Sequence, residues 1–232
     1  MVLILENHSN TATEIEAGLH IIRHILIAAI EEVAQFAVEG AQVLVAGSTW
    51  PEDENLLAQF IERNPQLNDR PLKLILVPHE INPEHLHFIF NRFQGKYVTY
   101  SAIAAMPSDM SRLNILQQAK ILVIDQIGML SSIYRFGQVA YVGGGFGVGI
   151  HNTIEAAVYG MPVLFGPNYH HFREAQGLID AGGGRSIKNY SEMEAALYTA
   201  FEQQPTLGAK AAEYVQSELG ATEKIYKELF AR

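Results

Sequence analysis

The feature that most constrains the fold is a repeated alternation, from residue 41 onward, of short apolar runs with helix-like stretches. The apolar runs are rich in β-branched residues, and most end in Gly, Pro or Asp, which is typical of strands. Because they are almost continuously apolar, we expect strands that are buried on both faces, as in a parallel sheet. The runs lie at residues 41–47, 72–78, 96–101, 120–125, 138–144 and 161–167.

Helix-like stretches separate these runs, and two of them begin with strong start signals. Pro51 precedes three acidic residues, and Pro83 follows Asn82, as is typical of a first helical turn. The repetition predicts an α/β fold: a Rossmann-like, doubly wound parallel sheet of about six strands with C-terminal helices. The helices expected between strands lie at residues 51–64, 82–93, 129–137, 152–160 and 171–182.

The remaining segments set the predicted domain limits. The Rossmann-like domain is expected to span residues 41–232 and to end in helices, the last an amphipathic piece at 221–232. Residues 1–40 have a helical pattern but follow no strand, and we interpret them as a boundary segment or as non-native sequence. Residues 102–115 lack a clear periodicity, which predicts a mobile loop.

Composition excludes several classes of function. The chain has 232 residues, of which 48% are hydrophobic and 18% charged, as in globular proteins. Its net charge of -9 argues against a nucleic-acid partner, and the absence of cysteine excludes disulfides and thiolate metal sites. No apolar run reaches the roughly 20 residues of a membrane span, and no signal-peptide pattern is present. We therefore expect a cytoplasmic chain.

The turns that follow the strands are where a ligand is expected, because open α/β sheets bind ligands beyond the carboxyl ends of their strands. The glycine-rich turn at residues 143–152 is the most informative of these. A helix expected from about Asn152 would present free N–H groups to an anion, and Glu155 in its first turn could accept hydrogen bonds from ribose hydroxyls. The alternative is that Glu155 only complements the helix dipole and Asn152 only caps the helix.

Other chemistries are disfavoured by spacing. The glycine run is not in the register of the dinucleotide fingerprint, and no P-loop lysine follows it, so neither a nicotinamide enzyme nor an NTPase is expected. Ser48 has no identifiable base and acid beside it, which argues against a nucleophile. His85 and His87 are two residues apart and do not share a helix face, so no metal site is expected. We also expect no cofactor.

Three segments carry a resemblance to a known family. Residues 142–184, VGGGFGVGIHNTIEAAVYGMPVLFGPNYHHFREAQGLIDAGGG, resemble the donor-binding signature of the Kdo (3-deoxy-D-manno-octulosonic acid) transferases. VAGSTWPEDE (45–54) and LILVPHEINPEHL (74–86) resemble that family's first two strand-end turns, in the same order. The resemblance covers about residues 41–190 and implies one half of a GT-B glycosyltransferase, the half that binds the donor CMP-Kdo.

The resemblance also implies roles for particular residues. Glu155 would hold the ribose, and His79 stands where many members of the family carry an arginine, so its ionic contact with the donor is in question. Arg173 would meet a donor carboxylate or make a surface ion pair, and His170 would be a polar lining residue. The complete set implied to bind the donor is Gly47, Ser48, Thr49, His79, Gly144, Gly145, Ile150, His151, Asn152, Thr153 and Glu155, with His170 and Arg173 as further donor contacts.

The N-terminal part departs from the family. Kdo transferases have an N-terminal acceptor domain with a membrane-anchoring segment and a catalytic glutamate, and nothing in residues 1–40 matches it. The resemblance therefore implies the donor half of an enzyme that transfers Kdo to a lipid A precursor at the cytoplasmic face of the Gram-negative inner membrane. This half is expected to be inactive alone. The alternatives are another GT-B glycosyltransferase or UDP-sugar epimerase domain, and a non-catalytic nucleotide-sugar-binding module.

Overall fold

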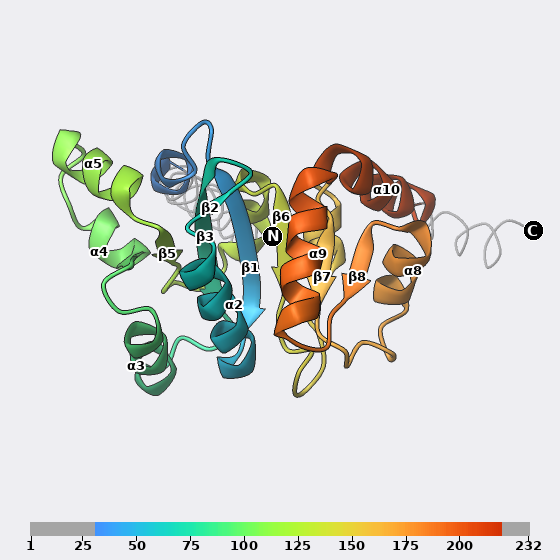
Figure 1. Cartoon of the computed structure of the whole chain (residues 1–232). Helices are drawn as coiled ribbons and strands as arrows, with labels where there is room; N and C mark the ends of the chain where they lie inside the picture. The colour runs from blue at the N-terminus through green and yellow to red at the C-terminus, as the bar shows by residue number, and fades with distance from the viewer. Residues whose placement is uncertain (1–30, 220–232) are drawn as a thin grey trace, which may run out of the picture.

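The fold is built around one parallel sheet, seen in the computed structural model, which describes residues 31–219 (Figure 1). Seven strands follow the order β4-β5-β3-β1-β6-β7-β8, and the short β2 pairs antiparallel with β3. The strands are β1 (Gln42–Thr49), β2 (Gln66–Leu67), β3 (Arg70–Pro78), β4 (Tyr97–Thr99), β5 (Ile121–Val123), β6 (Val139–Val142), β7 (Val163–Phe165) and β8 (Gly184–Ser186).

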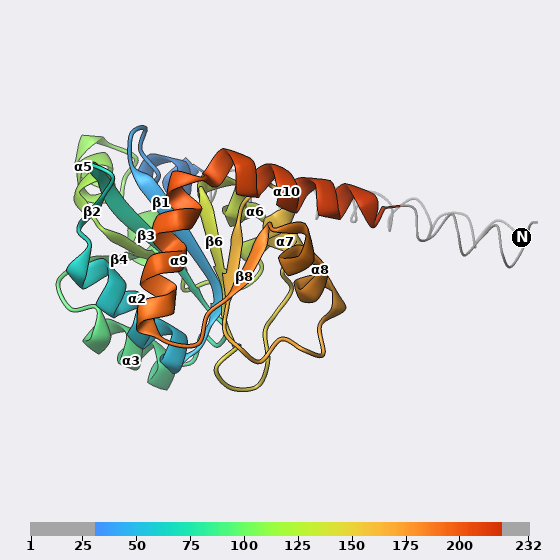
Figure 2. The same cartoon turned by 45° about the vertical axis from the view of Figure 1, so that its right-hand side comes forward.

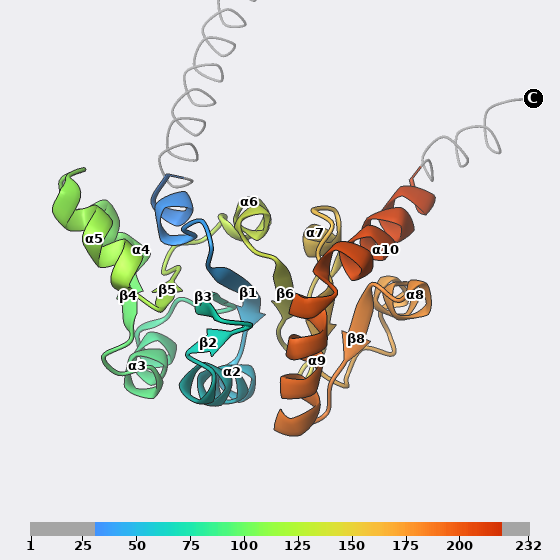
Figure 3. The same cartoon turned by 45° about the horizontal axis from the view of Figure 1, so that its top comes forward.

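Helices cover both faces of this sheet, which confirms the predicted doubly wound class (Figure 3). Along β1, Val43 and Val45 pack into one core cluster while Leu44 and Ala46 pack into the other. Strands buried on both faces need this unbroken run of apolar residues. The first layer holds α2 (Pro51–Arg63), α3 (Pro83–Arg92) and α9 (Tyr190–Glu202).

The second helical layer contains more helices than the first, and most of them are shorter. Within this layer α8 packs beside α10 (Figure 2). This layer holds α4 (Tyr100–Ala104), α5 (Met110–Gln118), α6 (Leu130–Ile133), the 3-10 turn η1 (Tyr134–Phe136), α7 (Ile154–Ala157), α8 (Arg173–Ala181) and α10 (Gln204–Ser217). Val33 and Phe36, from the helical residues 31–36, are fully buried in the same layer.

Several sequence-based expectations need correction. The expected loop at 102–115 is largely helical: the Asp109 carboxylate caps α5 by accepting from the N–H groups of Ser111 and Arg112. Arg112 then forms a buried ion pair with Glu32, a partner far away in the sequence. The sheet has more strands than the six expected, because β2 has only 2 residues and β8 (Gly-Arg-Ser) is not apolar, so neither gives a strand signal.

The helix expected at 152–160 is also shorter than predicted. α7 has only 4 residues, and Gly160 closes the segment with a positive φ of 68° before the chain enters β7. A single turn has only a small dipole, so the N-terminal end of α7 is a weak anion site by itself. The segments at 1–30 and 221–232 lie outside the described residues, and the proposed domain boundary at residue 41 stays a prediction.

Candidate functional site

The strand order places a crevice between β1 and β6. β3, β4 and β5 lie on one side of β1, and the chain then crosses from β5 to β6 on the other side of β1. Such a switch point leaves a crevice at the carboxyl ends of the two strands, where ligands bind in open α/β sheets. Here the Gly143 N–H donates to the Gly47 carbonyl across 2.9 Å, which joins the ends of β6 and β1.

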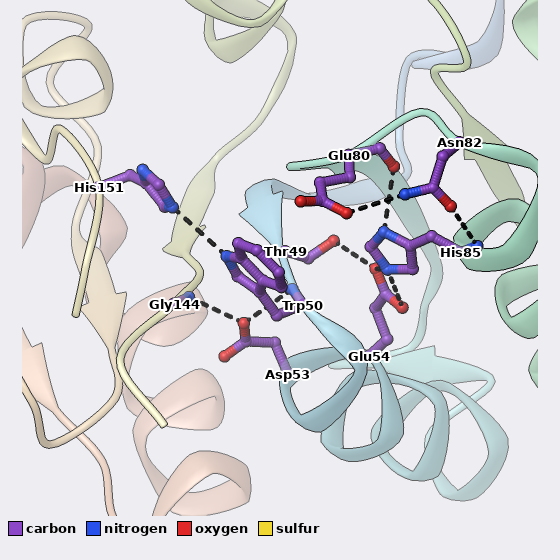
Figure 4. A network of polar contacts seen from close by, with 9 residues as sticks. All are labelled: Thr49, Trp50, Asp53, Glu54, Glu80, Asn82, His85, Gly144 and His151. Carbon is purple, nitrogen blue, oxygen red and sulfur yellow. Dashed lines mark hydrogen bonds and ion pairs between the residues drawn. The ribbon is translucent and has the colours of Figure 1, made fainter. Parts of the chain in front are cut away.

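One side of the crevice is held by buried side chains from the end of β1, α2 and α3, which we call the side-chain wall (residues 49–54 and 79–85). The Thr49 hydroxyl donates to Glu54 Oε1 at 2.8 Å, and His85 Nε2 lies 3.0 Å from the same oxygen (Figure 4). Thr49 and Glu54 are fully buried. The Thr49 side chain therefore positions α2 and is not itself exposed to the crevice.

His85 carries a positive charge into this wall. Its Nε2 faces the Glu54 carboxylate and its Nδ1 lies 3.0 Å from the Glu80 carbonyl oxygen, so both ring nitrogens face acceptors. Both contacts are hydrogen bonds only when the ring is doubly protonated. The hydrogen bond with Glu54 accordingly raises the pKa of His85, against the opposing effect of burial. This buried ion pair between Glu54 and His85 joins α2 to α3, and we call it the charged clasp.

Asp53 connects the side-chain wall to the glycine turn. Its carboxylate accepts from the Trp50 N–H at 3.0 Å, from the Tyr141 hydroxyl at 2.6 Å and from the Gly144 N–H at 2.9 Å. Burial raises the pKa of Asp53, and these three donors oppose the rise by stabilising the carboxylate. From the sequence, Asp53 was expected only as a helix-start acid, because its partners Tyr141 and Gly144 are 88 and 91 residues away.

The other side of the crevice is made mostly of backbone, and we call it the glycine wall (residues 143–153 and 166–168). Gly145 and Gly166 meet without side chains: a Cβ on Gly145 would lie 2.6 Å from the Gly166 Cα. The Asn168 N–H donates to the Gly145 carbonyl at 2.9 Å, which fixes the two turns together. Within residues 31–219, the N–H groups of His151, Asn152 and Thr153 have no hydrogen-bond acceptor.

Glu155 lies at the start of α7, where the sequence predicted it. Its Oε1 accepts from Asn152 Nδ2 at 3.1 Å, while Asn152 Oδ1 accepts from the Ile154 N–H. Glu155 also lies near Tyr134, since its charge adds to the effect of burial in raising the pKa of that phenol. Tyr134 in turn reaches β1, because a Cβ on Gly47 would lie 2.3 Å from its hydroxyl. Glu155 is therefore close to the β1 end of the crevice.

The structure brings most of the predicted residues to these two walls. Ser48 has a positive φ of 52° at the irregular end of β1, and Gly144 has a φ of 90° within the glycine wall. Thr153 has no exposed surface and Ile150 is almost fully buried, so neither residue offers a ligand much surface in this conformation. Their roles toward a ligand stay predictions.

The two further donor contacts, Arg173 and His170, stay predictions. Arg173 Nη2 is 3.7 Å from Glu218 Oε2, just beyond α10, and its side chain is 89% exposed. His170 borders a separate pocket beyond β7, together with Arg185 and Lys188. Among residues 31–219, no three His, Asp or Glu side chains gather as metal ligands would. No helix in the same range is long and apolar enough to cross a membrane.

Comparison with known proteins supports the resemblance to the Kdo transferases. No family model matches the chain. The 3-deoxy-D-manno-octulosonic acid transferase of Rickettsia prowazekii is 28% identical over 158 residues, covering 67% of this chain and 32% of that protein. The enzyme of the same name from Aquifex aeolicus is 28% identical over 155 residues, which is 66% of this chain and 40% of that protein. The chain thus spans well under half the length of these curated relatives.

Solved structures show the same fold. The C-terminal CMP-Kdo binding domain of WaaA from Acinetobacter baumannii matches with a TM-score of 0.66 and 21% identity, covering 84% of this chain and 99% of that domain. Sucrose-phosphate synthase from Thermosynechococcus elongatus matches with a TM-score of 0.55 and 15% identity, over 87% of this chain and 49% of that enzyme. These matches confirm a Rossmann-like half of the GT-B type.

Proposed function

We propose that this chain binds CMP-Kdo as the donor half of a Kdo transferase. The observation that carries the proposal is the switch in strand order between β1 and β6, where the segments that resemble the Kdo transferases meet. Gly47 and Ser48 end β1 at this crevice, and the glycine wall faces them. The curated relatives, which are Kdo transferases, add support from outside the structure.

The donor's groups can be assigned to the crevice on chemical grounds. Two consecutive N–H groups, those of His151 and Asn152, have no acceptor in the described chain and suit the oxygens of a phosphate, whereas Thr153 is fully buried beside them. The Glu155 carboxylate, bonded to Asn152 at the same turn, suits a pair of ribose hydroxyls. Ile150 and Gly145 contribute backbone to the same wall, and Gly144 is fixed through Asp53.

The whole reaction needs more than this half. In the proposed reaction an acceptor hydroxyl of a lipid A precursor attacks the Kdo anomeric carbon, a new glycosidic bond forms and CMP leaves. The donor half binds and orients CMP-Kdo, whereas the general base and the acceptor site belong to an N-terminal domain. We place the reaction at the cytoplasmic face of the Gram-negative inner membrane, with membrane contact made by the acceptor half.

Calorimetry with CMP, UDP and GDP tests the donor assignment. We expect CMP to bind about tenfold or more tightly than UDP or GDP, a preference of about 1.4 kcal/mol. A clear preference for UDP would favour another GT-B glycosyltransferase or an epimerase-like domain, and would contradict the proposal.

Reconstitution tests whether the chain contributes to catalysis. The chain is mixed with the separately produced N-terminal half of a Kdo transferase, and Kdo transfer to a lipid A precursor is measured. We expect transfer only when both halves are present. Transfer by this chain alone would overturn the assignment of the base to the other half, and CMP binding without any reconstituted transfer would favour a non-catalytic binding module.

A further inference from the structure

Three rings from three different turns pack together at the crevice. The His79 ring stacks on Trp50 with the ring centroids 4.8 Å apart, and on His151 with the centroids 4.2 Å apart. The Trp50 indole N–H also points at His151 Nε2, across 3.4 Å (Figure 4). His79 is exposed and His151 half-buried, so a ligand in the crevice can reach both imidazoles.

No carboxylate neutralises this pair. Among residues 31–219, none of the ion pairs includes His79 or His151. Four charged or titratable groups on the surrounding turns contact other partners, whereas Glu52, Glu84 and His171 make no ion pair within residues 31–219. The contacts of those four join Asp53 to the backbone of Trp50 and Gly144, Glu80 to Asn82, Glu155 to Asn152, and the His170 ring to Tyr169.

Without an anion beside it, His151 resists protonation. Burial lowers the pKa of His151, and a positive charge on His79 lowers it further. The Trp50 N–H acts in the same direction, because it needs an unprotonated Nε2 as its acceptor. Two stacked imidazolium rings would also repel each other at this distance.

An anion placed against the pair reverses this preference. A phosphate group bearing a negative charge stabilises both imidazolium forms and offers oxygens to their ring N–H groups. The backbone N–H groups of His151 and Asn152 lie on the same turn and are without acceptors in the described chain. An anion held there would therefore meet two protonated rings and a backbone cradle together.

We propose that the His79–His151 stack is the cationic contact for the donor phosphate, in place of the arginine that many of the resembled family carry at the position of His79. The inference rests on the proposed function and deepens it. Donor binding then takes up a proton, since the lowered pKa favours neutral His151 in the free protein and the donor phosphate favours its charged form. An arginine gives a charge at every physiological pH, whereas this stack makes donor affinity depend on pH.

Titration calorimetry on the whole chain tests the inference. The probe is the methyl ester of cytidine 5′-monophosphate, a phosphodiester with one fixed charge, so that the probe itself takes up no proton near neutral pH. We expect binding about tenfold tighter at about pH 6 than at about pH 8, with net proton uptake in buffers of different ionisation enthalpy. Histidine NMR signals should show the pKa of His151 rising on binding.

Two substitutions at the stack and one matched control complete the test. His79→Gln and His151→Gln should each reduce the pH ratio to about threefold or less. His79→Arg should bind more tightly at about pH 8 and lose most of the pH dependence, which a merely structural histidine would not do. His87→Gln, an exposed histidine on α3, should keep the wild-type pH dependence.

The outcomes separate this inference from the proposed function. Binding of the probe with no proton uptake and no pH dependence would overturn the role of the stack and leave the donor site standing. Absence of binding at every pH, with CMP also failing to bind, would overturn both. A His79→Arg variant that stays folded but retains the full pH dependence would contradict the inference even if wild type behaves as expected.

Discussion

On one side of the crevice buried side chains hold one another, whereas on the other side backbone meets backbone. In the side-chain wall, the ionisable side chains of Asp53, Glu54 and His85 are buried. In the glycine wall, Gly145 and Gly166 touch through main-chain atoms alone. The difference teaches that α2 and α3 are fixed by specific charged partners, while the turn that faces the donor is fixed by the absence of side chains.

The largest expected effect comes from removing the link between the two walls. Asp53→Ala leaves the Tyr141 hydroxyl and the N–H groups of Trp50 and Gly144 without their acceptor in a buried place. We expect a loss of about 4 kcal/mol in the free energy of unfolding, measured by urea denaturation. Glu52→Ala, an exposed acid in the same helical turn, should change stability by less than about 0.5 kcal/mol. Equal effects of the two substitutions would contradict this role of Asp53.

The glycine wall can be broken by one methyl group. Gly145→Ala would place a Cβ 2.6 Å from the Gly166 Cα, so the two turns must separate. We expect a loss of about 3 kcal/mol in unfolding free energy, together with weaker CMP binding. Gly147→Ala is the matched control in the same turn, because a Cβ there meets nothing within 4 Å. If both variants are equally stable, the backbone contact does not hold the wall.

Much of the fold was predictable because its strands are continuous apolar runs that periodicity detects. The hydrogen bonds of the side-chain wall were not predictable from the sequence. Asp53 meets Tyr141 and Gly144 only because β1 and β6 pair side by side in the sheet. The α5 helix was missed for the same reason: its buried Arg112 is polar, and only the distant Glu32 explains it. The glycine wall was predicted in position but not in form, since α7 is a single turn.

The charged clasp between Glu54 and His85 makes stability depend on pH. The folded-state pKa of His85 is raised above that of the unfolded chain, so the contribution is complete below the unfolded pKa and is lost as pH rises through the folded pKa. We expect His85→Gln to cost about 2 kcal/mol at about pH 6 and less at about pH 8, by urea denaturation. A cost that stays constant across this range would show that His85 is held neutral.

The smallest expected effect comes from Glu155, which follows residues 143–153 of the glycine wall in the sequence. Glu155→Ala should weaken CMP binding about tenfold, or about 1.4 kcal/mol, because the ribose hydroxyls lose a charged acceptor. Stability should change little, since the contact of Glu155 with Asn152 is exposed. Glu202→Ala, an exposed acid at the end of α9, is the control for a general loss of charge. Unchanged CMP affinity would leave Glu155 with the role of helix-dipole partner.

The contact between Gly145 and Gly166 also limits how this crevice can change over evolutionary time. A Cβ on either residue would collide with the main chain of the other, at 2.6 Å in both directions, and main chain offers no smaller residue as compensation. No second-site substitution at the partner position can therefore rescue the first. New donor preferences would therefore have to arise through side chains around the crevice, such as His79 and Trp50. Gly145 and Gly166 themselves would stay invariant.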